Sequence, residues 1–150
     1  MNKQTVIPLS LLLIFIIGCA SRTTIKPFTS DDCSCWPEGY DQKRQWEECC
    51  REHDLAYWAG GSYQERLEAD ERLRECVERT GDSAVARLMF YGVRVGGTAF
   101  LPLPWRWGYG WDFMRGYQPL TRRERKMVER MKKKYRVTRS GYRGAQNMRE

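Results

Sequence analysis

The stretch Cys-Cys-Arg-Glu-His-Asp at residues 49–54 decides how this chain folds, and it contains the single histidine of the sequence. Around it, over residues 42–58, apolar residues and cysteines recur at spacings of three and four, which is the pattern of an amphipathic helix. Two glycines at residues 60–61 break this helix. A second pattern of the same kind begins at residues 62–65 with the Ser-x-x-Glu spacing of a capping box and stops at Gly81.

The short turn fixes the relative direction of these two helices. Helices joined in this way must run antiparallel, so facing residues have position numbers with a nearly constant sum of about 124. Cys49 then faces Cys76, and His53 comes near Asp70. Side chains on helices packed about 8–10 Å apart reach bonding distance. The spacing therefore predicts a Cys49–Cys76 disulfide and a hydrogen-bonded His53–Asp70 pair.

A histidine held by a buried carboxylate has the arrangement of a general base, because the carboxylate fixes the tautomer and stabilises the imidazolium that forms. The next residue, Asp54, points about 100° further round the helix, away from that pair. Hard cations such as Ca²⁺ bind carboxylate and backbone carbonyl oxygens. A loop rich in Cys, Pro and Gly lies just upstream at residues 33–39. His53 and Asp54 are thus expected to have different roles, the first as a general base and the second as a ligand for a cation.

Together these motifs resemble the secreted phospholipase A2 superfamily over roughly residues 33–80. That family carries a Cys-Cys-x-x-His-Asp helix with a tyrosine four residues after the histidine, as at residues 49–57 here. It also has an aspartate followed six residues later by a cysteine, as at Asp70 and Cys76, and a Cys-x-Cys before the helix, as at residues 33–35. The resemblance implies a mainly α fold: a disulfide-linked antiparallel two-helix hairpin of phospholipase A2 type with additional helices.

The resemblance also implies a role for each matching residue. His53 would be the base that activates a water, Asp70 would orient His53, and Tyr57 would hydrogen-bond Asp70. Ca²⁺, held in part by the Asp54 carboxylate, would polarise the sn-2 ester of a glycerophospholipid and stabilise the oxyanion. The remaining implied residues are the calcium-loop carbonyls of Ser34, Trp36 and Glu38 and the disulfide Cys35–Cys50.

The chain departs from the family in two places. Trp-Pro-Glu at residues 36–38 stands where Gly-x-Gly is expected, and bulky residues limit the backbone geometries that aim carbonyls at a metal. Ala56 and Ala69 stand where the family usually joins its two helices by a disulfide. Because both cysteines of that disulfide are absent together, this second departure supports the alignment of the chain with the family.

The cysteines after Cys19 are odd in number, so at least one has no partner within the chain. Many family members pair the first loop cysteine with one near the C-terminus, but no cysteine follows Cys76. Cys33 is therefore expected to be the odd thiol, unless it replaces Cys35 as the partner of Cys50.

The N-terminus predicts export. An apolar run from Val6 to Ile17 follows a charged start, and a stretch of about a dozen residues is typical of a secretory signal, whereas a spanning helix needs roughly 20. Gly18-Cys19 resembles the lipobox of bacterial lipoproteins, in which the cysteine carries the lipid; an ordinary signal peptide or an uncleaved anchor is the alternative. Ala20 resembles the residue that lets such lipoproteins reach the outer membrane. The expected location is the bacterial cell envelope, lipid-anchored in the outer membrane and facing the periplasm.

The chain is expected to have four parts. Residues 1–18 form a lipoprotein signal peptide, and residues 19–32, which are polar and carry little periodicity, form a tether. Residues 33–137 form the helical domain, which ends in a basic helix over 121–136. Residues 138–150 are expected to form a disordered tail.

Two further segments lie between the hairpin and the basic helix. Residues 83–95 are expected to form a helix, and residues 100–111 form an aromatic loop broken by Pro and Gly. The loop is expected either to pack over the hairpin or to form an interfacial surface, since Trp and Tyr settle at the headgroup level of a membrane. The residues of the helix expected to point inward are Val85, Leu88, Met89, Tyr91 and Val93.

Charge is divided unevenly along the chain. Residues 20–82 hold 9 Lys and Arg against 15 Asp and Glu, a net charge of −6, whereas residues 83–150 hold 16 against 4, a net charge of +12. Export argues against nucleic acid as a partner. The basic half predicts either solvated helix faces or attraction to anionic lipid headgroups of a phospholipid membrane, where each cation contributes about 1 kcal/mol.

Three functions compete at this point. The first is calcium-dependent hydrolysis of the sn-2 ester of glycerophospholipids by a water that a His-Asp pair activates. The second is a non-catalytic envelope lipoprotein that keeps the phospholipase A2 fold for binding or structure. The third is a zinc site, which is disfavoured because adjacent helical cysteines point about 100° apart. Its ligands would come from Cys33, Cys35, Cys49, Cys50 and His53.

Overall fold

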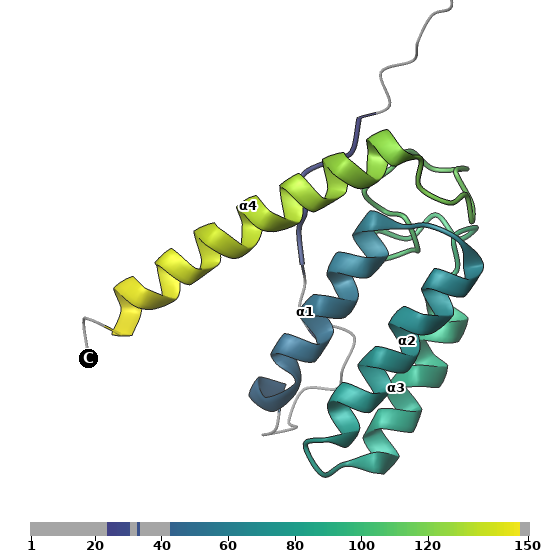
Figure 1. The fold of residues 1–150 in the computed structure, drawn as a ribbon. Coiled ribbons are helices and arrows are strands. Elements are labelled where there is room, and N and C mark those ends of the chain that lie inside the picture. Colours follow the sequence, from purple (N-terminus) through teal and green to yellow (C-terminus); the bar gives the residue numbers. More distant parts are fainter. Residues whose placement is uncertain (1–23, 31–32, 34–42, 148–150) are drawn as a thin grey trace, which may run out of the picture.

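The computed structural model describes residues 24–30, residue 33 and residues 43–147 (Figure 1). Over these ranges the fold is all-helical, with four helices and no strand. This agrees with the mainly α class expected from the sequence. The helices are α1 (Lys43–Ala59), α2 (Tyr63–Glu78), α3 (Ser83–Gly96) and α4 (Arg122–Asn147).

Helices α1 and α2 form the predicted antiparallel hairpin, and α3 packs against α2 (Figure 1). The capping box that starts α2 is present: Ser62 Oγ accepts from the backbone N–H of Glu65 at 3.2 Å, and the Glu65 carboxylate accepts from the N–H of Ser62 at 2.7 Å. Gly60 turns the chain with φ of +64°, a region that side chains other than glycine rarely adopt.

One core cluster joins the three helices at the end of the hairpin that lies away from this turn. Trp46 of α1 and Val77 of α2 are fully buried there, and Ala86 of α3 completes the contact. Burial of such side chains stabilises the fold by about 1.5–3 kcal/mol each. The full cluster is Cys33, Trp46, Cys49, Cys50, Leu73, Val77, Val85, Ala86 and Met89.

Two disulfides tie this cluster together. Cys49–Cys76 joins α1 to α2, as the antiparallel spacing predicted. Cys50 pairs with Cys33, with their Cα atoms 5.5 Å apart, so the implied Cys35–Cys50 disulfide is wrong and the alternative partner is the one present. Positions 33 and 35 are too close in sequence for spacing to choose between them, and only the path of the incoming chain decides. Cys35 itself lies outside the described residues.

Residues 24–30 pack against the helices although the sequence assigned them to a tether. Trp58 Nε1 donates to the carbonyl of Lys26 at 2.8 Å, and the N–H of Lys26 donates to the carbonyl of Gly110 at 2.8 Å. Ile25 is buried in a second core cluster together with Trp58. This part of the predicted tether therefore belongs to the folded domain. Residues 1–23 lie outside the described ranges, so the signal peptide and the lipidation of Cys19 stay predictions.

The aromatic loop closes the C-terminal end of α1, where helical carbonyls lack partners within the helix. Trp111 Nε1 donates to the carbonyl of Ala59 at 2.6 Å, and Trp107 Nε1 donates to the carbonyl of Gly61 at 2.8 Å. Both indoles are only 1% exposed. Packing over the hairpin, one of the two expectations for this loop, is therefore confirmed for its second half.

Helix α3 buries a different face from the one expected. Val85 and Met89 are buried as predicted, and Ala86 joins them, but Leu88 and Tyr91 are 62% and 64% exposed. The buried positions lie within one stripe of the helix, and residues 88 and 91 lie roughly 100° or more away from its centre. The prediction for these two residues is wrong because α3 is apolar on more than one side, so periodicity does not identify the face that packs.

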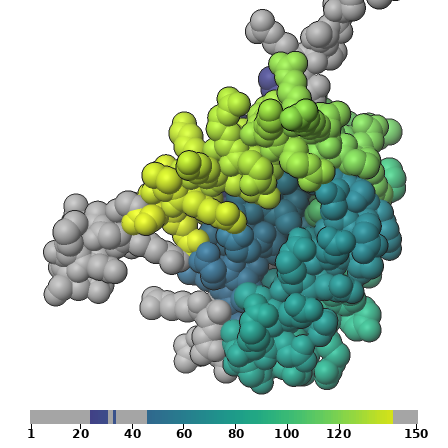
Figure 2. Space-filling model, in the orientation of Figure 1, coloured from purple at the N-terminus to yellow at the C-terminus, as the bar shows by residue number. Residues whose placement is uncertain are grey.

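Helix α4 lies across the end of α1 and continues past it (Figures 1 and 2). Its Val128 is 1% exposed and packs in the second core cluster. The helix extends to Asn147, so the predicted end at residue 136 is wrong, and residues 138–147 are helical where a disordered tail was expected. Two ion pairs to α1 lie near that position, Arg136–Glu52 at 2.8 Å and Arg139–Glu48 at 2.7 Å. Sequence periodicity does not reveal such contacts between distant segments.

Candidate active site

His53 and Asp70 meet across the hairpin, as the spacing predicted. His53 Nε2 lies 2.8 Å from Asp70 Oδ1. Asp70 is fully buried and His53 is 8% exposed. The Cys49–Cys76 disulfide lies one helical turn before His53 and holds the two helices in this register.

Tyr57 completes the arrangement that the resemblance implied. Its hydroxyl donates to Asp70 Oδ1 at 2.7 Å, and its ring packs edge-on against Trp107. Burial and the neighbouring Asp70 carboxylate raise the pKa of Tyr57. The phenol therefore stays protonated at neutral pH and acts as a donor that fixes the carboxylate.

Two arginines also contact this site, and the sequence reasoning missed both. Arg94 of α3 donates to Asp70 Oδ2 at 2.7 Å. Arg66 of α2 is 2% exposed, donates to the Tyr57 hydroxyl at 3.1 Å and lies 3.7 Å from Asp70 Oδ2. Each oxygen of the carboxylate therefore has at least one donor, and two guanidinium groups balance its charge.

The sequence contained a signal for each arginine. Arg66 lies four residues before Asp70, which is the spacing of an ion pair on one helix face. Arg94 lies across the α2–α3 turn, where the same constant-sum argument, with a sum of about 161, places Asp70 within one turn of it. The 26 arginines and lysines of the chain make such pairings too frequent for spacing to select these two.

Hydrogen bonds keep Asp70 ionised. Burial acts to raise the pKa of Asp70, but hydrogen bonds from His53, Arg94 and Tyr57 outweigh it and lower the pKa below its usual value. An ionised carboxylate accepts the proton of His53 Nε2. In the neutral ring, the lone pair is then on Nδ1, which is the atom that acts as a base.

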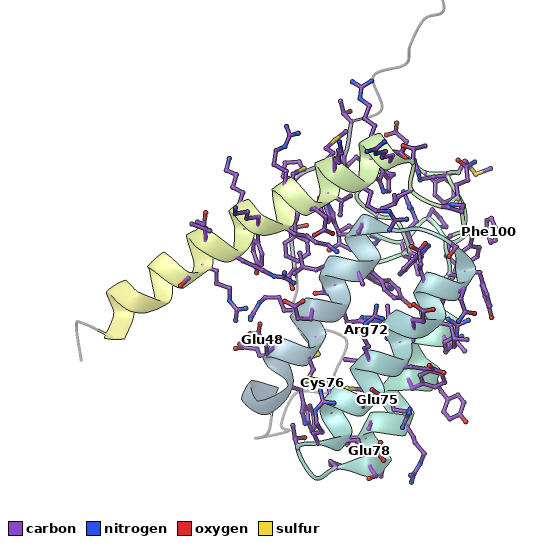
Figure 3. The ribbon with its side chains drawn as sticks, viewed as in Figure 1. Glu48, Arg72, Glu75, Cys76, Glu78 and Phe100 are labelled. Atoms are coloured by element: carbon purple, nitrogen blue, oxygen red, sulfur yellow. A yellow bond between two sulfur atoms is a disulfide. The ribbon has the colours of Figure 1, made fainter. Side chains whose placement is uncertain are left out.

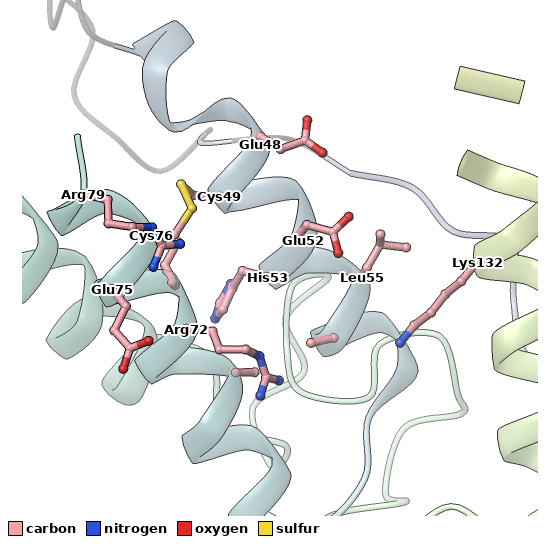
Figure 4. A pocket seen from close by; sticks show the side chains of 13 residues that line it. Glu48, Cys49, Glu52, His53, Leu55, Arg72, Glu75, Cys76, Arg79 and Lys132 are labelled. Carbon is pink, nitrogen blue, oxygen red and sulfur yellow. A yellow bond between two sulfur atoms is a disulfide. The ribbon is translucent and has the colours of Figure 1, made fainter. Parts of the chain in front are cut away.

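His53 lines a cleft of about 600 Å³ between α1 and α2 (Figure 4). Its Nδ1 makes no hydrogen bond with any residue in the described part of the chain. Ala56 and Ala69, which stand where the family usually has a disulfide, line the same cleft from facing helices. The arrangement can therefore accept a proton at Nδ1 from a water bound in the cleft.

Asp54 faces away from this cleft toward residues 24–30. Its Oδ2 accepts from the hydroxyl of Ser30 at 2.5 Å, and its backbone carbonyl accepts from the hydroxyl of Tyr109 at 3.3 Å. The other implied calcium ligands, Ser34, Trp36 and Glu38, lie outside the described residues. Among the residues that are described, no three His, Cys, Asp or Glu side chains gather as a metal site. Calcium binding stays a prediction.

The zinc alternative is wrong for the residues that can be placed. Cys33, Cys49 and Cys50 are all in disulfides, and His53 is bonded to Asp70. Disulfide sulfur atoms are not thiolates and do not serve as the ligands that zinc requires.

Gly97 lies directly against the Tyr57 side chain, so an alanine at this position is expected to destabilise the fold. In Gly97→Ala the new Cβ would overlap the Tyr57 ring and hydroxyl and lie 2.8 Å from the carbonyl of Val93. We expect a loss of about 1–3 kcal/mol in the free energy of unfolding, measured by urea denaturation. The matched control is Gly96→Ala, where a Cβ meets nothing within 4 Å. Equal stability of the two variants would contradict the packing described.

Comparisons of this chain with protein-family models, with curated proteins and with solved structures return no match.

Proposed function

We propose that this chain is a phospholipase A2-like hydrolase that cleaves the sn-2 ester of glycerophospholipids. The observation that carries the proposal is the buried Asp70 bound to His53 Nε2, with His53 Nδ1 unbonded within the described residues and next to a cleft. A base in this position contributes about 10²- to 10⁴-fold to a rate.

The chemistry follows from the proton positions. A water in the cleft gives a proton to His53 Nδ1 as its oxygen attacks the ester carbonyl. The imidazolium is stabilised by Asp70, which stays an anion because Tyr57 and Arg94 hold it. The same proton then passes to the leaving oxygen. The resemblance assigns calcium at Asp54 a Lewis-acid role, but Asp54 faces residues 24–30 in this fold, so the steps above use only His53, Asp70 and the cleft.

An exposed apolar surface supports a lipid substrate. Leu88, Tyr91 and Val95 lie at spacings of three and four on α3 and are each more than 60% exposed. Phe100, which is 64% exposed, points outward from the loop that follows (Figure 3). Large apolar residues exposed in this number mark an interaction site, and aromatic residues suit a membrane interface. Leu101, Trp105, Phe113 and Met114 are the other large apolar residues exposed on this segment.

The basic C-terminal half fits the same partner. Helix α4 presents a largely cationic exposed surface, and anionic phospholipid headgroups attract each such charge by about 1 kcal/mol. In the described ranges, none of the helices is apolar over a length sufficient to cross a membrane. Attachment through lipidated Cys19, and residence in the bacterial envelope, belong to this proposal.

His53→Gln tests the proposal. Glutamine has no basic nitrogen, so we expect acyl release from phosphatidylglycerol–phosphatidylethanolamine vesicles to fall by about 10²- to 10⁴-fold. The full chain in detergent is assayed with calcium and with chelator. Glu47→Gln, an exposed change on the same helix, is the control and should keep full activity. Acyl release that persists unchanged in His53→Gln would show that the histidine is not the base.

A non-catalytic lipid-binding role is the second candidate, because Asp54 already accepts the Ser30 hydroxyl and residues 36–38 lack the expected glycines. Vesicle binding without acyl release at any calcium concentration would favour this role over hydrolysis.

A further inference from the structure

Two cations approach the cleft beside His53 from different helices. Arg72 extends from α2 next to the His53 ring, and Lys132 reaches toward the cleft from α4 on the opposite side (Figure 4). Arg72 makes no hydrogen bond or ion pair with the residues that the structure describes. Lys132 forms an ion pair with Glu129 of its own helix at 3.6 Å.

The acidic residues of the same cleft do not balance these charges, because other arginines already pair with them. Glu48 pairs with Arg139 at 2.7 Å, and Glu52 pairs with Arg136 at 2.8 Å. Glu75 lies 3.9 Å from a neighbouring arginine and is exposed. Arg72 therefore keeps its positive charge without a partner among the described residues, and Lys132 pairs there only with Glu129, which is exposed.

We propose that Arg72 and Lys132 form an anion-binding subsite that takes the phosphate group of a phosphate ester. A guanidinium presents paired N–H donors that match phosphate oxygens, and an ammonium binds phosphate as a point charge. Arg79 lines the same cleft two turns further along α2, beside the Cys49–Cys76 disulfide (Figure 4). The subsite rests on the proposed function for its role, which is to place the substrate phosphate beside the base.

The single histidine provides the measurement. Its ring signals are recorded by NMR on the full chain in detergent, during titration with inorganic phosphate and with monomers of dihexyl-ether phosphatidylglycerol, whose ether links resist hydrolysis. Ionic strength is held constant with sodium chloride. We expect a saturable shift of the His53 signals for at least one of the two phosphates.

Variants identify the cations. Arg72→Gln and Lys132→Gln should each raise the apparent Kd about tenfold, since each removes one charge-assisted contact. Arg72→Lys should keep most of the binding of inorganic phosphate. The control is Arg74→Gln on the same helix, because Arg74 pairs with Glu78 at 2.9 Å and does not line the cleft.

The outcomes separate the phosphate sources and the two proposals. Tighter binding of the ether lipid identifies a lipid headgroup, and equal or tighter binding of inorganic phosphate identifies a soluble phosphate; both support the subsite. No saturable shift with either probe, or the same Kd in Arg72→Gln and Arg74→Gln, would overturn it. Phosphate binding without acyl release refutes hydrolysis alone, and acyl release without phosphate binding refutes the subsite alone.

Discussion

An Asp70→Asn variant is expected to lose about 3–5 kcal/mol of the free energy of unfolding and about 10⁴-fold of its hydrolytic activity. Stability falls because Arg66 and Arg94 keep their charges after the carboxylate that balances them is gone. Activity falls because an asparagine amide donates to His53 Nε2. The ring proton is then on Nδ1, and the atom facing the cleft is no longer a base.

Urea denaturation at several pH values checks the first part of this prediction. The pKa of Asp70 is lowered in the folded state, so its contribution is complete above the unfolded pKa of about 3.9 and is lost as pH falls through the folded pKa. Wild-type stability should therefore decline in acid below about pH 4, and Asp70→Asn should lack that part of the decline. Acyl release at neutral pH checks the second part.

Glu71→Gln is the control for Asp70→Asn, because Glu71 is the exposed neighbour on the same helix. It should keep both wild-type stability and wild-type activity. If both variants unfold at the same urea concentration, the buried network around Asp70 does not stabilise the fold as described.

Removal of the Cys49–Cys76 disulfide by double replacement with serine is expected to cost about 3.5 kcal/mol, because this bond closes a loop over a sequence separation of 27 residues. It should also lower activity, since His53 lies one turn along α1 from the bond and Asp70 lies on the helix to which α1 is joined. Urea denaturation without reductant and acyl release measure the two effects.

The second disulfide provides the comparison. Replacing Cys33 and Cys50 opens a loop with a separation of 17 residues and should cost a similar amount, about 3 kcal/mol. Both bonds involve the first helix, but only Cys49–Cys76 joins it to the helix that carries Asp70. At temperatures where both variants are folded, activity should therefore fall more when the Cys49–Cys76 pair is removed. The opposite order would mean that the register of α1 and α2 does not depend on that bond.

Local rules were sufficient for the hairpin and for the central pair of the site. The short Gly-Gly-Ser turn at residues 60–62 requires α1 and α2 to run antiparallel. The capping box of Ser62 and Glu65 starts α2. Once the direction and the turn are known, helical geometry determines which residues face each other. The Cys49–Cys76 bond and the His53–Asp70 contact followed from this arithmetic.

Tertiary structure decided the features that depend on contacts between separate segments. Helix α3 is apolar on more than one face, so only its packing on α2 determined that Ala86 is buried and Leu88 is exposed. The choice of Cys33 over Cys35 depended on the path of the chain before α1. The extension of α4 past residue 136 coincides with ion pairs to glutamates more than 80 residues earlier, which no local pattern reveals.

The same distinction between local spacing and tertiary packing applies to the residues of the candidate site. The sequence by itself determined the histidine, its carboxylate and the helix register that brings them together, because these depend on spacing within one short hairpin. Only the tertiary structure surrounded Asp70 with Arg66 and Arg94 and placed Arg72 and Lys132 beside the His53 cleft. Those side chains come from three helices. The distances between them depend on how the helices pack against each other, and no local sequence pattern specifies that packing.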